Sequence, residues 1–400
     1  MPSARLPFRA IDFKTRFPAL DGIRALAVTM VFALHFGGGG THGGSILKVV
    51  NAVRDRGGAG VDIFFVLSGF LITGILFDTR HDSQYFKRFF ARRSLRIFPI
   101  VYLLFAILAI LTPIVGYQWH WQQTLFLLYV GNLFANANFE LYLLRSVAHP
   151  VAEGTLAHLW SLCVEEQFYL VWPIVVWLIR DRAKLLWTSF GLVVLALLVR
   201  IAAVEAWPPE VWQVWLPRSL PFRLDDLVMG AILALLLRGP AADMVQRSMK
   251  WVFLVGLAGT LLSYHFSPDS NSAWALTGQM TLIGVAAVGL IGMTLRAESW
   301  VYAVFNLRPL QILGKYSYGF YVWHIVWGRA WIEVLIYLTK RFHSTAIGGI
   351  VSLTLTFVTT FVVAKLCYDL YEVKFLKWKY KFEYDSELRE HKTAFAVDGN

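Results

Sequence analysis

The sequence is poor in charge and nearly free of cysteine. Only 16% of its 400 residues are Asp, Glu, Lys or Arg, whereas soluble domains carry roughly 25%. Hydrophobic residues make up 57% of the chain and the mean hydropathy is +0.55, which excludes one ordinary soluble core. Cys163 and Cys367 are the only cysteines, which excludes a disulfide framework. Aromatic residues are plentiful, with 16 Trp, 30 Phe and 16 Tyr, as is typical of proteins that cross two membrane interfaces.

Apolar runs long enough to cross a bilayer, about 20 residues each, recur along the chain. They predict an all-α, polytopic transmembrane bundle of about ten helices. The expected spans lie near residues 19–36, 59–78, 97–116, 158–180, 184–204, 220–237, 250–266, 274–294, 311–331 and 345–367. A further apolar stretch at 124–135 is too short to cross, and we expect a re-entrant or in-plane segment that protein covers.

The distribution of Lys and Arg predicts the orientation of the bundle. Ten spans put both termini on one side, and the segments on that side hold 24 Lys and Arg against seven in the opposite loops. The positive-inside rule therefore puts both termini in the cytoplasm. We expect a cytoplasmic segment at 1–18, a transmembrane domain at 19–372 and a cytoplasmic tail at 373–400, in a bacterial inner membrane. The net charge of +11 is explained by topology, and no nucleic-acid partner is expected.

Ionisable side chains inside predicted spans are costly and by default mark a functional site. With the orientation fixed, His35 lies at the outer end of the first span. Asp62 lies at the outer start of the second, and Glu165 and Glu166 at that of the fourth. An imidazole near carboxylates is the arrangement that general base catalysis uses. We expect Asp62 or a glutamate to orient His35. Glu165 and Glu166 differ by about 100° on a helix, and Glu165 is the weakly favoured cavity residue.

Arginines mark the cytoplasmic face. Arg93 and Arg96 share a helix face at i and i+3 and have the geometry to grip a polyphosphate, although they would also serve as ordinary topology anchors. Arg24 is expected to line the inner half of the same cavity. The eleven residues from Arg24 to His35 rise about 16 Å in a helix, which is comparable with an extended pantetheine arm.

At these residues the chain resembles the acyltransferase-3 family of membrane O-acyltransferases. The matching pieces are FPALDGIRALAVTMVFALHF, GVDIFFVLSGFLI, the R-x-x-R of Arg93 and Arg96, HLWSLCVEEQFYL, FRLDDLVMG and LGKYSYGFYVWH. The resemblance implies transfer of an acyl group, usually acetyl, from cytoplasmic acetyl-CoA or another acyl-CoA to a hydroxyl of a glycan or small molecule. It also implies that His35 is the essential histidine, that Arg24 is its partner, and that Arg93 and Arg96 grip the CoA phosphates.

Several alternatives stay open. His324 is expected either to line the acyl-CoA channel or to be a satisfied buried polar group, and no metal site is visible. Transfer would be direct, with His35 as general base, or would pass through an acylated His35. A proton-coupled transporter of a sugar or lipid is the main rival function. The glycine-rich stretch at 35–45 and the long segment at 137–157 would form an entrance or lid, or serve as plain linkers.

Overall fold

The computed structural model describes residues 17–36, 54–115, 119, 121–134, 156–331, 337, 340–341 and 345–385. Helices dominate these residues and no strand occurs among them, which confirms the all-α prediction. The long helices are α1 (Pro18–Phe36), α3 (Ala59–Asp78), α4 (Tyr85–Val115), α7 (Trp160–Leu178), α8 (Arg182–Ala206), α10 (Leu220–Leu236), α11 (Ala242–Phe266), α12 (Met280–Thr294), α14 (Arg308–Ala330) and α16 (Thr345–Cys367). Shorter ones are α5 (Trp121–Thr124), α9 (Pro209–Arg218), α13 (Trp300–Phe305) and α17 (Val373–Lys377).

Polar caps begin two of the helices that follow tight turns. Asp181 stands just before α8, and its carboxylate accepts a hydrogen bond from the Lys184 N–H at 2.8 Å. Ser299 caps α13 in the same way, through the Tyr302 N–H. Such caps satisfy N–H groups that have no partner within the helix. They let the chain reverse between helices within a few residues.

The ten predicted spans each fall on one of the long helices. Seven segments are long and apolar enough to cross a membrane by length and composition: Pro18–Phe36, Ala59–Asp78, Tyr85–Pro113, Ala157–Leu178, Arg182–Ala206, Ala275–Thr294 and Ile350–Phe382. The helices α10, α11 and α14 fall outside this set. A membrane-spanning bundle is therefore confirmed, whereas the number of ten spans stays a prediction.

The stretch predicted to be re-entrant is not a continuous helix. It forms two short 3-10 helices, η1 (Leu125–Leu128) and η2 (Gly131–Phe134), separated by Tyr129 in a left-handed conformation with φ 55°. Asn132 is fully buried, and its amide donates to the Arg218 carbonyl at 2.9 Å. Its side-chain oxygen accepts from Gln167 at 2.7 Å. Protein therefore covers this backbone at Asn132, whereas Leu128 is 70% exposed and Phe134 45% exposed, and the re-entrant placement stays a prediction.

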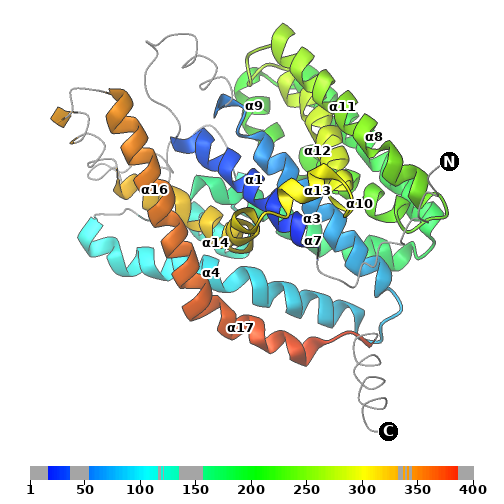
Figure 1. The fold of residues 1–400 in the computed structure, drawn as a ribbon, viewed down its shortest axis with the longest axis horizontal. Helices are drawn as coiled ribbons and strands as arrows, with labels where there is room; N and C mark the ends of the chain where they lie inside the picture. The colour runs from blue at the N-terminus through cyan, green and yellow to red at the C-terminus, as the bar shows by residue number, and fades with distance from the viewer. Residues whose placement is uncertain are drawn as a thin grey trace, which may run out of the picture.

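The centre of the bundle is built on close contact between helix backbones. In Figure 1, α1, α3 and α10 lie in the middle of the view, with α4 running along their lower side. A Cβ added at Gly69 of α3 would lie 1.7 Å from the Leu227 carbonyl of α10, and one at Gly230 would lie 1.9 Å from the Val66 carbonyl of α3. Only glycine permits this approach, which is a common device in membrane helix packing. The two helices therefore form a fixed frame.

The outside of the bundle is apolar. On α8, Trp187 is 74% exposed and Leu198 is 56% exposed, and on α11 Val255 is 66% exposed. Both helices lie at the upper right of Figure 1, where α11 packs against α12 and α8 packs against α10. Bare apolar surface over whole helix faces is unfavourable in water, and lipid is the solvent that such a surface requires.

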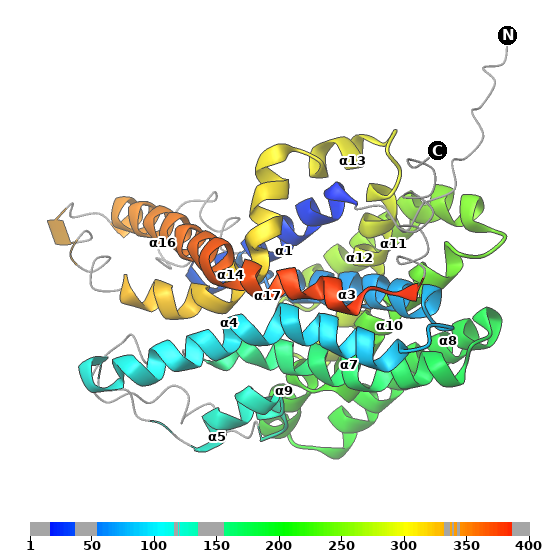
Figure 2. The same ribbon diagram turned by 90° about the horizontal axis from the view of Figure 1, so that it is seen from below.

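The chain runs on as helix beyond the last predicted span. A π-helical turn at Tyr368–Glu372 joins α16 to α17, and the 3-10 helix η7 (Trp378–Phe382) follows. This segment lies beside the beginning of α4 (Figures 1 and 2). The predicted domain boundary at 372 thus falls within continuous helix. Residues 1–16 and 386–400, and most of the predicted loops at 35–45 and 137–157, lie outside the described residues.

Candidate active site

A basic cavity opens where the start of α1 meets the end of α3 and the start of α14. Its volume is about 460 Å³. The charged residues that line it are Arg24, Arg96, Arg238, Lys315, Asp21, Asp78 and Glu372. Among the described residues, Arg96 and Lys315 form no ion pair with a carboxylate. The excess of cations suits an anionic ligand.

A second, deeper cavity of about 280 Å³ adjoins the first. Arg24, Arg96 and Tyr318 line both cavities. The polar residues found only around the deep cavity are Ser68, Arg93, Ser161, Glu165, Tyr169, Ser317 and Tyr321. The two cavities thus form one path that leads from the basic mouth into the interior of the bundle.

The two arginines of the R-x-x-R motif line the path, Arg96 in both cavities and Arg93 in the deep cavity. The helix α4 presents Arg93 and Arg96 on one face, because residues three apart are neighbours on a helix. Both line the deep cavity, and the Arg93 guanidinium lies 5.0 Å from the centre of the Tyr169 ring. Neither has a carboxylate partner within ion-pair distance in the described part of the chain. Their charge is directed at the cavity and is available to a ligand.

The neighbouring glutamates of α7 have different surroundings, as their 100° separation predicts. Glu165 lines the deep cavity, and its Oε1 accepts a hydrogen bond from the Ser68 hydroxyl at 2.6 Å. Glu166 does not appear in the wall of either cavity, and its Oε1 is buried without a hydrogen-bond partner among the described residues. Glu165 is therefore the glutamate that a ligand in the cavity would meet.

His35 lies at the end of α1 and contacts His324 of α14. Its Nδ1 is 3.2 Å from His324 Nε2 and 2.9 Å from the Val31 carbonyl oxygen. The two rings lie 5.0 Å apart, centre to centre. The structure therefore joins two predicted site residues that are 289 positions apart in the sequence.

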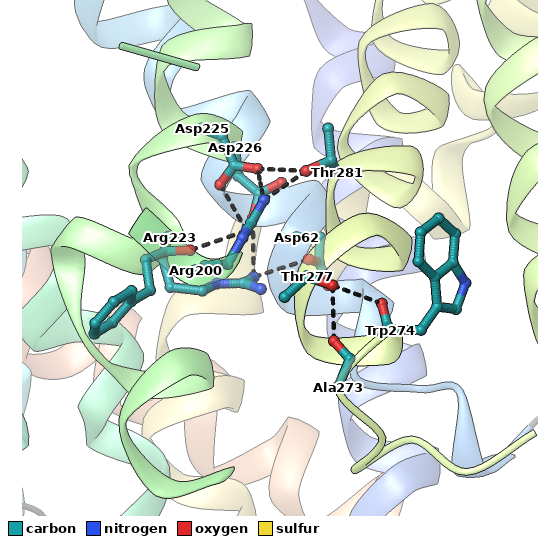
Figure 3. Close-up of polar contacts among 10 residues, drawn as sticks. Asp62, Arg200, Arg223, Asp225, Asp226, Ala273, Trp274, Thr277 and Thr281 are labelled. Atoms are coloured by element: carbon teal, nitrogen blue, oxygen red, sulfur yellow. Dashed lines mark hydrogen bonds and ion pairs between the residues drawn. The ribbon is translucent and has the colours of Figure 1, made fainter. Parts of the chain in front are cut away.

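Asp62 has a partner other than the histidine that it was predicted to orient. Its Oδ1 accepts a hydrogen bond from Arg223 at 2.8 Å, and Arg223 also lies 3.0 Å from Asp226. Figure 3 shows Asp62 directed at Arg223. Among the described residues His35 is not a partner of Asp62. The orienting role of Asp62 stays a prediction with no contact to support it.

A buried ion-pair cluster extends from this contact across α3, α8 and α10. Its members are Asp62, Arg200, Arg223, Asp225 and Asp226, all nine-tenths or more buried. Arg200 donates to both carboxylate oxygens of Asp225, at 3.1 and 2.6 Å, and to Thr281 (Figure 3). Arg200 was missed in the sequence, although an isolated Arg within the apolar run LALLVRIAAV is itself a marker of a paired intramembrane charge.

His158 is a second residue that was missed. It lies in the 3-10 turn η4 (Ala157–Leu159) just before α7, and its ring centre is 5.0 Å from that of His324. Its place as the first residue of the matched segment HLWSLCVEEQFYL was the available marker. In the described part of the chain no group of three or more His, Cys, Asp or Glu has the arrangement to hold a metal ion.

The described residues thus form a membrane bundle with a basic path into its interior and a pair of histidines next to Tyr321 of the path's wall. A family model described as an acyltransferase domain matches residues 17–368, so the chain belongs to the acyltransferase-3 family that its motifs resemble.

Relatives of known name give a finer comparison. The chain is 29% identical over 324 residues to the O-acetyltransferase OatA of Staphylococcus aureus (strain NCTC 8325 / PS 47), a match that covers 77% of this chain and 50% of the relative. It is 28% identical over 385 residues to the peptidoglycan O-acetyltransferase OatA of Listeria monocytogenes, covering 90% of this chain and 56% of the relative. The chain thus spans about half the length of these relatives. No solved structure gives a significant match.

Proposed function

We propose that this chain transfers an acetyl group from cytoplasmic acetyl-CoA to a hydroxyl of a cell-envelope glycan. The observation that carries the proposal is the path from the basic cavity into the deep cavity, where the wall residue Tyr321 contacts His324, the neighbour of His35. The acetyl group and the glycan class are suggested by the names of the relatives, and peptidoglycan is the first acceptor to test.

The charges along the path support CoA as the carrier of the acyl group. CoA is a polyphosphate with a long, narrow arm that ends in a thioester. Arg93, Arg96 and Lys315 supply cations without carboxylate partners in the described part of the chain, and guanidinium groups bind phosphate in bidentate fashion. The 16 Å or so from Arg24 to the level of His35 matches the reach of the arm. We infer that the phosphates bind where the two cavities meet, near Arg93 and Arg96, while the thioester lies further along the deep cavity.

His35 is the proposed general base. The acceptor hydroxyl gives its proton to the imidazole as its oxygen attacks the thioester carbonyl. The C–S bond then breaks, and the proton passes from the imidazole to the CoA thiolate. Positioned general bases of this kind contribute roughly 10²–10⁴-fold to the rate. Acetylation of His35 followed by transfer is the competing route.

The orientation follows from the charge asymmetry of the loops. We propose a multi-pass protein of the bacterial inner membrane with both termini in the cytoplasm, so that the basic cavity faces the acetyl-CoA pool. The acceptor then approaches His35 from the opposite side.

Inverted membrane vesicles, which expose the cytoplasmic face, provide the test. Labelled acetyl-CoA is added outside, and alkali-labile label on the glycan fraction is counted. Wild-type vesicles should incorporate acetyl ester and release CoA, whereas His35→Ala vesicles with the same amount of folded protein should incorporate none. Full incorporation by the Ala variant would refute the role of His35, and a wild-type protein that neither binds nor consumes acetyl-CoA would refute the proposed function.

A further inference from the structure

Three histidine rings from three separate elements form a row next to Tyr321, a residue that lines the deep cavity. His35 comes from α1, His324 from α14 and His158 from η4. The centre of the His324 ring is 5.0 Å from each of the other two. His324 is 1% exposed and His158 is 3% exposed, so both rings are fixed by their surroundings.

The hydrogen bonds of His324 determine which of its nitrogens carries the proton. Its Nδ1 lies 2.5 Å from the Tyr321 carbonyl oxygen. A carbonyl oxygen only accepts hydrogen bonds, so Nδ1 must be the N–H donor. In the neutral ring, Nε2 then has the lone pair, and it is this atom that faces His35 at 3.2 Å.

The same reasoning assigns the proton on His35. Its Nδ1 lies 2.9 Å from the Val31 carbonyl and 3.2 Å from the lone pair of His324 Nε2. Both partners are acceptors, so Nδ1 of His35 is protonated and its hydrogen is shared between them. Nε2 of His35 is therefore the ring nitrogen with the lone pair, as a general base for the acceptor hydroxyl requires.

We propose that His324 is the positioning residue of His35. It accepts the Nδ1–H of His35, which fixes the tautomer and the ring orientation, and it stabilises the imidazolium that forms when Nε2 takes the proton of the acceptor. This is the part that a carboxylate plays in many hydrolases, and here a neutral imidazole fills it. The proposal rests on the proposed function, in which His35 is the base.

Tyr321 connects this pair to the deep cavity. Its ring lines the cavity, and its hydroxyl lies 2.5 Å from the Ser161 hydroxyl and 2.7 Å from the His158 carbonyl oxygen. Its own carbonyl is the group that holds His324. One residue thus forms the cavity wall and sets the tautomer of the neighbouring histidine.

His158 supports the pair from the other side. Its Nε2 donates to the Val322 carbonyl at 3.2 Å, and its ring lies edge-on to the ring of His324. His324 therefore cannot turn away from His35 without displacing a second buried ring.

Three substitutions at one position separate positioning from packing. Asn at 324 keeps a donor near the place of Nδ1 but has no group that reaches His35. Gln puts an amide oxygen near the place of Nε2, and Phe keeps an aromatic ring with no polar atom. In the inverted vesicles we expect His324→Asn and His324→Phe to lower kcat about 100-fold and His324→Gln to recover to within about tenfold of wild type. KM for acetyl-CoA should stay near the wild-type value, because the basic cavity is untouched.

A packing role gives the opposite ranking. Phe would then retain the most activity, because its ring best replaces imidazole, and Gln would be no better than Asn. Either that ranking or an unchanged kcat in all three variants overturns the proposal. Melting temperatures in detergent establish that each variant is folded, and the Asn and Gln comparison decides the question even if the Phe variant does not fold.

His35→Ala, assayed beside them, separates this proposal from the function on which it rests. If His35→Ala is inactive and the His324 variants turn over at the wild-type rate, the positioning role alone fails. If His35→Ala retains turnover, the assignment of the base fails and the positioning role fails with it.

Discussion

Two groups of charged residues lie inside this bundle, and they differ in whether each charge has a partner of opposite sign. In the ion-pair cluster two arginines face three aspartates, and every member contacts a partner of opposite sign. Around the deep cavity, Arg93 and Arg96 face open space and have no carboxylate partner among the described residues.

The presence or absence of a partner separates charges that hold the helices together from charges that line the deep cavity. Burying an ion costs several kcal/mol unless a partner of opposite charge is in contact. The cluster meets this requirement internally and joins α3, α8 and α10. Arg93 and Arg96 have no such partner among the described residues, so a bound anion would supply the missing counter-charge. The first group should therefore govern stability, and the second should govern binding.

The sharpest test of the frame is Asp225→Ala. It leaves Arg200, which is fully buried, without its counter-charge, and loss of one partner of such a pair costs about 3–5 kcal/mol. We expect a large fall in the melting temperature and in the yield of monodisperse protein. The control is Asp243→Ala, which breaks an exposed pair with Arg247 on α11 and should cost at most about 1 kcal/mol. Equal melting temperatures for the two variants would show that the buried pair contributes no more to stability than the exposed pair.

The cavity arginines should give the complementary result. Arg93→Gln and Arg96→Gln each remove charged hydrogen bonds worth about 1.5–3 kcal/mol, so the Kd for acetyl-CoA should rise roughly 10–100-fold. The melting temperature of the unliganded protein should hardly change. Lys87→Gln, an exposed cation on the same helix, is the matched control. Binding of labelled acetyl-CoA in detergent measures the effect, and an unchanged Kd would reduce the two arginines to topology anchors.

Within α7, the comparison narrows to two adjacent residues. Glu165→Gln removes a carboxylate that lines the deep cavity and holds Ser68, so turnover in inverted vesicles should fall about tenfold or more. Glu166→Gln changes a group outside both cavity walls and should have a much smaller effect. The opposite order would assign the catalytic carboxylate to Glu166.

The smallest effect on stability is expected outside both groups of charges. Asp385 follows η7 and contacts Arg88 of α4. Hydrogen bonds from Arg88 and the Ser83 N–H lower the pKa of Asp385 to about 2, against about 3.9 in an unfolded chain. The lowered pKa means that the stabilisation is present above pH 4 and is lost as the pH falls through 2. Asp385→Asn should therefore lower the melting temperature slightly at pH 7. The difference from wild type should shrink as the pH falls from 4 to 2 and should be lost below pH 2, whereas a difference that stays constant over that range would assign the effect to something other than charge.

Hydropathy alone predicted where the helices lie, because a span must be apolar over a length that the bilayer fixes. Depth along a span could also be read, since the rise per residue is constant, and this placed His35, Asp62 and Glu165 at similar levels. The direction in which a side chain points around its helix could not be read. Because of that direction, Asp62 contacts Arg223 and His35 contacts His324.

Contacts between distant segments were the other gap. The pairing of His35 with His324 depends on how α1 and α14 cross, and neither helix contains a pattern that specifies its partner. The choice of Glu165 was available from helix geometry only as an alternative to Glu166. Only part of the ion-pair cluster could be read from the sequence. Arg223, Asp225 and Asp226 lie in the matched segment FRLDDLVMG, whereas Arg200, the partner of Asp225, stands alone in an apolar run.

The helices α1 and α14 meet backbone to backbone near the start of both. A Cβ added at Gly314 would lie 1.7 Å from the Asp21 carbonyl, so the two backbones touch at that point. From this contact, His324 lies about 15 Å along α14 and His35 about 21 Å along α1. A change of about 5° in the crossing angle at this contact would move the His324 ring by roughly 1.3 Å. That displacement is enough to break the 3.2 Å hydrogen bond to His35. The alignment of the two histidines therefore depends on the crossing angle of α1 and α14, which this contact fixes together with a second one near the other end, where a Cβ added at Gly328 would lie 2.2 Å from the Phe36 ring.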